Sequence, residues 1–484
     1  MIQMSEETAN LLIAAGKQDW VSPRESLVSA KGKGLLQTYW LIMKGSNCER
    51  NSILGDQSVA SDTIHVEDIG PLEVGGDKFN IEDERIRRMV EWNVDVLQRQ
   101  LKKIIAMRDK KPARASPITL RNKVVEDQTV LDEVKEVIPL STKPNEYKKD
   151  PDGIELDPDV MQQLRDYVGA IANMYRDNPF HSFEHASHVT QSVSKLLTRV
   201  VTPDSIDYNS LSYTKSHQEA KLHEYTYGIT SDPIIQFACT FSALIHDVDH
   251  PGVPNATLVS ENADIAAIYK DKSVAEQHSV DLAWELLMEP TYNDLRACIY
   301  QNQDELDRFR QLVVNAVMAT DIADKELGAL RKNRWDKAFS DLGSQSSSNS
   351  KSEDVNRKAT IVIEHLIQAS DVAHTMQHWH VYQKWNERLF HEMFKAYQAG
   401  RSEKNPADVW YEGEIGFFDY YIIPLAKKLK DCDVFGVSSD EYLNYASANR
   451  QEWVTKGRQV VAGYLEKYQG VSPDIRSGAK GPPV

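Results

Sequence analysis

The stretch FSALIHDVDHPG, residues 241–252, begins as an apolar run suited to a buried helix and ends in polar side chains that can bind a metal. These side chains are His246, Asp247, Asp249 and His250. Burying them without partners would cost several kcal/mol, so a metal ion is the natural compensation. His246 and His250 share one helix face, whereas Asp247 points about 100° away. An ion between two helices can still be reached by both His246 and Asp247.

The composition is ordinary for a soluble globular protein, with 484 residues, of which 41% are hydrophobic and 26% charged. This length fits two or three domains, or one large domain with extensions. The net charge of −16 argues against a nucleic-acid-binding surface over the whole protein, so no nucleic-acid partner is expected. A local anionic ligand remains compatible with this charge, because a metal site can supply positive charge.

Several features favour a cytoplasmic location. No run approaches 18 apolar residues, so no transmembrane helix is expected, and the N-terminus does not resemble a secretory signal. The four cysteines are far apart and form no CxxC pair, which is typical of a reducing compartment. A longer parent protein could still be anchored in a membrane through segments outside this sequence.

Helical periodicity predicts an all-α main domain over residues 156–470, because apolar residues recur there at i, i+3 and i+4. Within it, the polar stretch 343–354 is predicted to be a disordered loop. Residues 46–155 are interpreted as a linker, extended after residue 108, that contains one long helix at about 81–108. Residues 471–484 are predicted to be a disordered tail.

The linker helix carries one apolar stripe whose members alternate at spacings of four and three residues. We expect this stripe to pack on its own domain. The alternative is a homodimer through a short coiled coil, although barely two heptads are present. The stripe consists of Val90, Val94, Leu97, Leu101 and Ile104.

Histidines and aspartates in three separated clusters provide a set of metal ligands. The first cluster, NPFHSFEHASHV, contains His181, His185 and His188, the second is the opening stretch, and the third, IEHLIQASDVAH, contains Asp371. One histidine from the first cluster, the His–Asp pair of the second and Asp371 would make a mixed nitrogen and oxygen set. Such a set suits zinc or another first-row divalent ion with positions left open for water.

A second ion is compatible with the same residues. The second carboxylate oxygen of Asp247 could bridge to a harder ion, Mg²⁺ or Mn²⁺, that keeps mostly water ligands. Two ions about 4 Å apart can hold a hydroxide and clamp a phosphate.

Six motifs, in this order, resemble those of class I cyclic nucleotide phosphodiesterases, which are all-helical members of the HD phosphohydrolase group. The motifs are HSFEH, HDVDHPGVPN, KSVAEQH, VMATD, QASDVAH and GEIGFFDYYIIPL. The resemblance covers roughly Asp157 to Tyr468. It implies a compact multi-helix domain that hydrolyses a 3',5'-cyclic nucleotide to the 5'-nucleoside monophosphate in cyclic nucleotide signalling.

The resemblance also implies a role for individual residues. His181 would be the general acid that protonates the leaving O3' atom. The tighter metal would be Zn²⁺, and the second Mg²⁺ or Mn²⁺ with Asp247 as the bridge. The implied ligands of the tighter metal are His185, His246, Asp247 and Asp371. The residues implied to hold metal-bound water and orient the acid are His250 and Glu276. The residues implied to hold the purine are Phe417, which stacks on it, and Leu389 on its opposite face.

Three positions depart from the family's pattern. Ser182 replaces an asparagine and Phe180 a tyrosine, and neither change removes a ligand. Glu414 occupies the position of the glutamine that recognises the purine. An ionised carboxylate only accepts hydrogen bonds, whereas an amide can donate or accept. Because guanine presents two donors on one edge, we expect cGMP to be favoured over cAMP.

Residues 1–45 are predicted to contain a short helix at 5–16 and a strand at 35–43. IQMSEETANLL followed by AKGKGLLQTYWL resembles the C-terminal end of a class III nucleotide cyclase domain, in which Lys31 or Lys33 would reach a triphosphate. The metal-binding and base-reading residues of a cyclase would lie upstream. We therefore expect a remnant of a cyclase–phosphodiesterase fusion that cyclises nothing itself.

Two other functions fit part of the pattern. Another HD-type phosphohydrolase, acting on a nucleotide monophosphate or an alarmone, would share the metal ligands but would not need GEIGFFDYYIIPL. A non-catalytic sensor of cyclic nucleotides would be favoured by the loss of a ligand. All four ligand positions and His181 are filled in this sequence.

Overall fold

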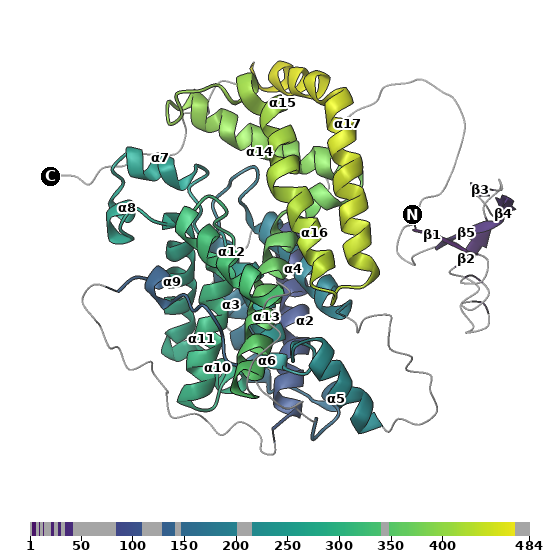
Figure 1. Ribbon diagram of the computed structural model, residues 1–484, viewed down its shortest axis with the longest axis vertical. Coiled ribbons are helices and arrows are strands. Elements are labelled where there is room, and N and C mark those ends of the chain that lie inside the picture. Colours follow the sequence, from purple (N-terminus) through teal and green to yellow (C-terminus); the bar gives the residue numbers. More distant parts are fainter. Residues whose placement is uncertain are drawn as a thin grey trace, which may run out of the picture. The chain divides into compact units, whose positions relative to one another are not determined.

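The computed structural model describes residues 84–108, 128–140, 147–200, 215–339 and 348–469, together with short segments between residues 2 and 41. The chain divides into two compact units, Met1–Val74 and Gly75–Val484. The described part of the second unit is helical throughout (Figure 1), which confirms the predicted all-α class.

The N-terminal unit contains two small antiparallel sheets. Strands β1 (Ile2–Ser5), β5 (Thr38–Leu41) and β2 (Val21–Pro23) pair in that order, and β3 (Val28–Ala30) pairs with β4 (Gly34–Leu36). Residues 38–41 lie within the predicted strand 35–43. Most of the predicted helix 5–16 lies outside the described residues. The likeness to a nucleotide cyclase stays a prediction.

The helices of the second unit form one layered bundle. In Figure 1, α14, α15 and α17 lie in its upper part, and α2, α3, α10 and α11 in its lower part. A π-helical turn, Phe418–Ile422 (η7), joins α15 to α16. The helices are α2 (Glu84–Ala106), α3 (Pro158–Met174), α4 (Phe183–Thr198), α5 (Lys215–Tyr225), α6 (Pro233–Ile245), α7 (Asn255–Ser260), α8 (Asp264–Ile268), α9 (Val274–Met288), α10 (Asn293–Ile299), α11 (Gln303–Met318), α12 (Lys325–Phe339), α13 (Ser348–Asp371), α14 (Trp379–Gln398), α15 (Pro406–Phe417), α16 (Ile423–Asp431) and α17 (Val437–Tyr468).

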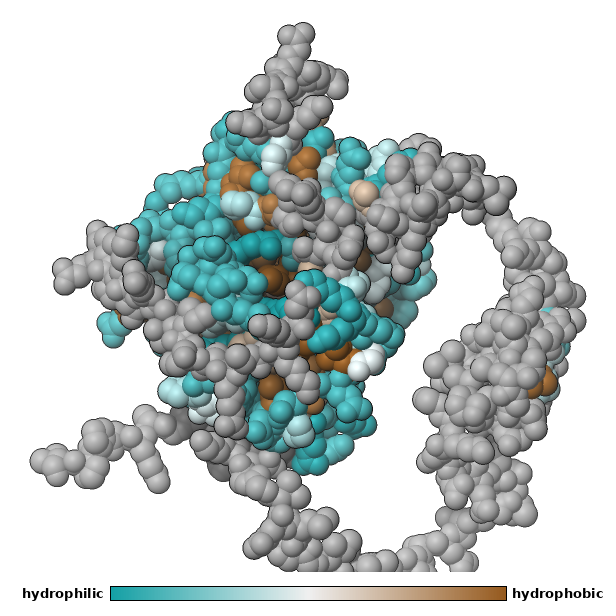
Figure 2. Space-filling model, turned by 90° about the horizontal axis from the view of Figure 1, so that it is seen from below, coloured by the Kyte–Doolittle hydropathy of each residue, from teal (hydrophilic) through white to brown (hydrophobic). Residues whose placement is uncertain are grey.

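Helix α6 is the centre of the lower part, where it packs against α2, α4 and α11. Pro233 occupies its first turn, and the Asp232 carboxylate accepts hydrogen bonds from the N–H groups of Ile234 and Ile235. Almost every residue of α6 is buried. Figure 2 shows a mainly hydrophilic surface on the face it displays, as expected when apolar side chains fill such a core.

The predicted linker helix is confirmed as α2, and its apolar stripe is buried within its own unit. Every member of that stripe is at most 2% exposed. On the same helix, the buried Asn93 donates a 2.9 Å hydrogen bond to Ser187 of α4. The stripe is therefore occupied by intrachain packing and is not free to form a coiled coil.

Two predictions about irregular segments differ from the structure. Residues 128–140 lie on the helical unit: Val130 and Ile138 are buried, and the Ile138 N–H donates to Thr360. Residues 128–140 are anchored to the helical unit because Val130, Ile138 and Leu140 pack in its hydrophobic core. The predicted loop 343–354 is helical from Ser348 onward, and Arg357 pairs there with Glu353 and Asp354 one turn away.

No helix in the described ranges combines the length and apolar character that a membrane span requires.

Replacing Leu101 with alanine tests whether α2 belongs to the core. Leu101 is 0% exposed, so L101A should lower the free energy of unfolding by about 2–5 kcal/mol. Asp95, exposed on the same helix, provides the control, and D95A should change stability by no more than about 0.5 kcal/mol. Chemical denaturation measures both. Equal stabilities for L101A and D95A would mean that α2 does not contribute to the core.

Candidate active site

The four predicted metal ligands converge at one point inside the helical unit. His185 lies on α4, His246 directly follows α6, and Asp371 ends α13. One ligand atom from each of these three lies within 4.8 Å of the others. Asp247 completes the set, because its Oδ2 lies 3.1 Å from His246 Nε2 and 3.6 Å from His185 Nε2.

The structure selects among the candidates that the sequence offered. His185 is the histidine of the first cluster that joins the set, whereas the His188 ring lies beside Trp385. Of the opening stretch, Asp249 forms a separate group with Arg176 and His278. The positive φ of 58° at Asp249 turns the backbone after Asp247.

The lone pairs in this cluster are arranged to receive a cation. His246 Nδ1 lies 2.9 Å from the Ala243 carbonyl, which fixes the proton on Nδ1 and leaves the Nε2 lone pair for the cluster. Both His246 Nε2 and Asp247 Oδ2 are buried, and neither has a partner with hydrogen-bond geometry within the described chain. Two imidazoles and two carboxylates in this arrangement fit a divalent metal ion.

The cluster keeps its carboxylates ionised. Burial would raise the pKa of Asp371, but the hydrogen bond with His185 and the proximity of His246 outweigh it, and the pKa lies below the usual range. Burial likewise opposes ionisation of Asp247, and His246 and His181 lower its pKa well below the ordinary value. The site therefore offers negative charge to an ion near neutral pH.

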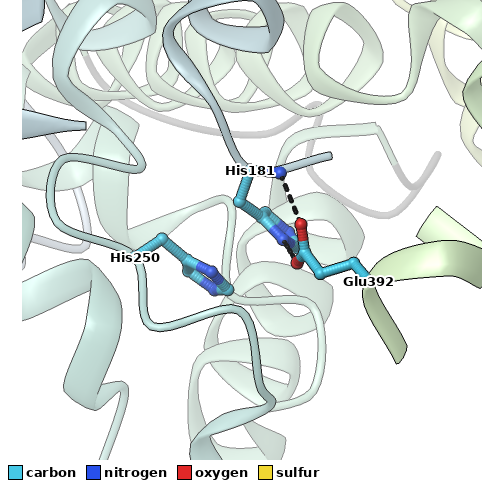
Figure 3. Close-up of side chains that lie close together, drawn as sticks. All are labelled: His181, His250 and Glu392. Atoms are coloured by element: carbon cyan, nitrogen blue, oxygen red, sulfur yellow. Dashed lines mark hydrogen bonds and ion pairs between the residues drawn. The ribbon is translucent and has the colours of Figure 1, made fainter. Parts of the chain in front are cut away.

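His181 lies beside this cluster and is held by Glu392 of α14 (Figure 3). One Glu392 oxygen accepts hydrogen bonds from the backbone N–H groups of Phe180 and His181, at 2.8 and 3.0 Å. The other oxygen bonds to His181 Nδ1. The His250 ring stacks on the His181 ring with a centroid distance of 3.8 Å. These contacts fix the orientation of the His181 imidazole.

The two stacked imidazoles have opposite tendencies to hold a proton. Burial alone would lower the pKa of His181. The carboxylates of Glu392 and Asp247 outweigh this effect and raise the pKa to about 9. Burial and the neighbouring His181 lower the pKa of His250 to about 3. At neutral pH, His181 therefore carries the proton and His250 is neutral.

Glu392 was missed by the sequence analysis. It is 3% exposed on its side chain and contacts a histidine that lies more than two hundred positions earlier in the chain. The local sequence LFHEMF gives no signal that its glutamate is buried. Only the packing of α14 against the loop before α4 brings these groups together.

Glu276 lies in a separate polar group beside the cluster. The Asn255 amide donates to Glu276 at 2.9 Å and to Asp321 at 3.4 Å. Burial, followed by repulsion from Asp321, raises the pKa of Glu276 to about 7. Asn178 ties the two loops of the site together, because its amide donates to the carbonyls of His181 and His250. Ser182 begins α4 by capping the His185 N–H.

The residues predicted to hold a purine lie on α14 and α15, which pack against each other. Glu414 is buried on α15, and the Tyr382 hydroxyl donates to its Oε2 at 2.7 Å. Phe417, one turn later, stacks on Tyr421 with a centroid distance of 5.4 Å. Burial and the carboxylate of Asp371 raise the pKa of Tyr421, so this aromatic pair lies on the side of the metal cluster. Leu389 of α14 is half-buried.

Comparison with protein families identifies this arrangement. Residues 180–435 match the model of the 3'5'-cyclic nucleotide phosphodiesterase family. The chain belongs to this family. The family is metal-dependent, in agreement with the cluster of His185, His246 and Asp371.

Individual relatives are more distant. The chain is 27% identical over 277 residues to the probable 3',5'-cyclic-AMP phosphodiesterase pde-4 of Caenorhabditis elegans, and the match covers 55% of this chain and 36% of the relative. The chain thus spans about a third of that protein.

Two structures of the phosphodiesterase domain of a Salpingoeca rosetta rhodopsin phosphodiesterase were also found. Each solved chain is 22% identical to this chain, and the TM-scores are 0.46 and 0.45. The matches cover 64% of this chain and 84% and 86% of the respective solved chains.

Replacing Glu392 with glutamine should lower the pKa of His181. In metal-free protein the value should fall from about 9 toward or below 6.5, because the variant loses the carboxylate while burial remains. NMR titration of the His181 imidazole measures this change. E387Q, which alters a partly exposed glutamate on the same helix, is the matched control and should leave it unchanged. An unchanged pKa in E392Q would show that Glu392 does not hold the proton on His181.

Proposed function

We propose that this chain hydrolyses a 3',5'-cyclic nucleotide to the 5'-nucleoside monophosphate and favours cGMP over cAMP. The observation that carries this proposal is the convergence of His185, His246, Asp247 and Asp371 beside His181, whose ring is held by Glu392. Membership of the phosphodiesterase family supports it. The chain spans only part of its relative, so the activity of the whole protein is likewise a proposal.

The four converging residues would hold the tighter ion, which we propose to be Zn²⁺, and Asp247 would share a second ion, Mg²⁺ or Mn²⁺. When bound, such ions neutralise phosphate charge and supply a water that is nucleophilic near neutral pH. The chain's own task is then to deliver a proton to the leaving O3' atom. His181 is protonated and oriented for this step by Glu392 and His250.

The remaining residues would position the substrate and water. Glu276 lies beside Asp321, where both contact the Asn255 amide, and would accept a hydrogen bond from metal-bound water. Phe417 would stack on the purine, and Leu389 would contact its opposite face. The ionised carboxylate of Glu414 would accept hydrogen bonds from guanine N1–H and N2–H₂, whereas adenine presents the N1 lone pair to it. The nematode relative, by contrast, is named as a probable cyclic-AMP phosphodiesterase.

Other expectations from the sequence remain proposals. Residues 1–45 would be a remnant of a nucleotide cyclase without cyclase activity. The location would be cytoplasmic. A homodimer through α2 would have to use its exposed polar face, since the apolar stripe is buried within the chain.

Metal removal tests the proposed chemistry. The purified full chain should hydrolyse cyclic nucleotide, lose activity on complete chelation, and regain it with Zn²⁺ and Mg²⁺ or Mn²⁺. D371A should reduce kcat by more than about 100-fold, since loss of even an outer partner of a metal ligand typically costs 10–100-fold. D440N, at an exposed aspartate, is the control. Undiminished turnover after verified metal removal would refute the proposal, and tight binding without turnover would favour the sensor.

Substitution of Glu414 tests the proposed selectivity. At about pH 8 the wild-type kcat/KM should favour cGMP by roughly 10- to 100-fold, which corresponds to about 1–3 kcal/mol for one mismatched edge atom. E414Q should bring this ratio close to one, because its amide can meet either purine. E412Q, two positions away on the exposed side of α15, is the matched control. A wild type that prefers cAMP at this pH would contradict the proposed selectivity.

A further inference from the structure

Glu414 is a buried acid that is surrounded by neutral hydrogen-bond donors. The residue is 9% exposed, and the Tyr382 hydroxyl donates to Oε2 at 2.7 Å. Asn386 is the second partner. Because Asn386 Oδ1 accepts from the Trp410 indole N–H at 3.1 Å, its amide N–H₂ group is the part left to face Glu414.

The partners of other buried acids are different. Glu364 pairs with Arg334, and Glu392 pairs with His181. Within the described ranges no lysine, arginine or histidine forms an ion pair with Glu414. Burial disfavours a charged carboxylate, but a neighbouring cation outweighs this effect and keeps the group ionised. Neutral donors stabilise the carboxylate less, so both protonation states can exist near neutral pH.

The groups that face Glu414 from neighbouring helices stay neutral. Tyr382 faces it from α14 and Tyr464 from α17, and both interact with it electrostatically. Burial raises the pKa of each phenol above its ordinary value, so neither ionises near neutral pH. For Glu414 itself, burial outweighs the bonds from Tyr382 and Asn386 and raises the pKa to about 7.

The two protonation states present different hydrogen-bonding patterns. The carboxylate offers acceptors only, and the neutral acid offers one O–H donor and one acceptor. The guanine edge presents N1–H and N2–H₂ as two donors. The adenine edge presents the N1 acceptor beside the N6–H₂ donor. The carboxylate therefore matches only guanine, whereas the neutral acid, like an amide, can match adenine or the O6 and N1–H pair of guanine.

We propose that the proton on Glu414 decides whether the site accepts adenine, so that one active site moves from hydrolysing both cyclic nucleotides toward cGMP as the pH rises. This inference rests on the proposed function, since it requires Glu414 to meet the purine edge. By linkage, cAMP binding takes up a proton on the carboxylate, whereas cGMP can bind to either protonation state.

The experiment is a competition between cAMP and cGMP in one reaction, from about pH 6 to about pH 8.5. It measures the ratio of the two kcat/KM values. Both substrates meet the same free enzyme, so ionisations of His181 and of the metal site cancel in the ratio. The ratio of cGMP to cAMP should stay near one below the midpoint and rise by up to about tenfold per pH unit above it, within the limit set by the carboxylate's discrimination.

Three variants separate the role of Glu414 from general effects of pH. E414Q should give a ratio that does not change with pH, because its amide has no proton to lose. Y382F should move the midpoint to higher pH, because the carboxylate loses a donor that stabilises it. E412Q should follow the wild-type profile.

The outcomes distinguish this inference from the proposed function. Hydrolysis of both nucleotides at a pH-independent ratio would overturn the inference and leave the phosphodiesterase activity intact. A ratio that rises equally in wild type and E414Q would also overturn it. Failure to hydrolyse either nucleotide at any pH, with metals supplied, would instead refute the proposed function.

Discussion

The structure depends on one electrostatic constraint: two carboxylates and two imidazoles must share a buried point. Ionised Asp247 and Asp371 repel each other there, and only positive charge from imidazolium or metal makes their burial tolerable. The elements that meet at this point are α4, α6 and α13. Because α6 is buried along nearly its whole length, it fixes where His246 and Asp247 emerge. The packing of one apolar helix thus sets the geometry of the charged centre.

Two buried glutamates illustrate how neighbours determine chemistry. Glu392 faces His181 and two backbone N–H groups, and these partners lower its pKa to about 2 although burial raises it. Glu414 faces a phenol and an amide, and burial prevails. Glu392 is therefore a fixed negative charge that keeps a proton on its partner. Glu414 can itself gain or lose a proton near neutral pH, and its hydrogen-bonding pattern changes when it does.

The sequence was sufficient for what depends on local spacing and insufficient for what depends on packing. The motifs that contain His185, the His246–Asp247 pair and the helix-terminal Asp371 indicated a shared ion, and the structure brings these groups together. Periodicity also predicted α2. Glu392 could not be found, because its burial arises from contact between α14 and a distant loop. The helical start of α13 was missed because its composition is polar, although Arg357 supports it through pairs along the helix.

Helix α2 contacts two of the helices that position metal ligands, α4, which carries His185, and α6, which directly precedes His246. Asn93 bonds to Ser187, two residues after His185 on α4, and Lys103 donates to Gln236 on α6 at 3.0 Å. At its other end, Arg85 pairs with Glu184 in the first turn of α4. A fragment beginning at residue 156 would lack all these contacts and would expose apolar surface of α3 and α6 that α2 covers. The helices that support the site therefore include α2. A displacement of α2 would disturb α4, which carries His185, and α6, which directly precedes His246.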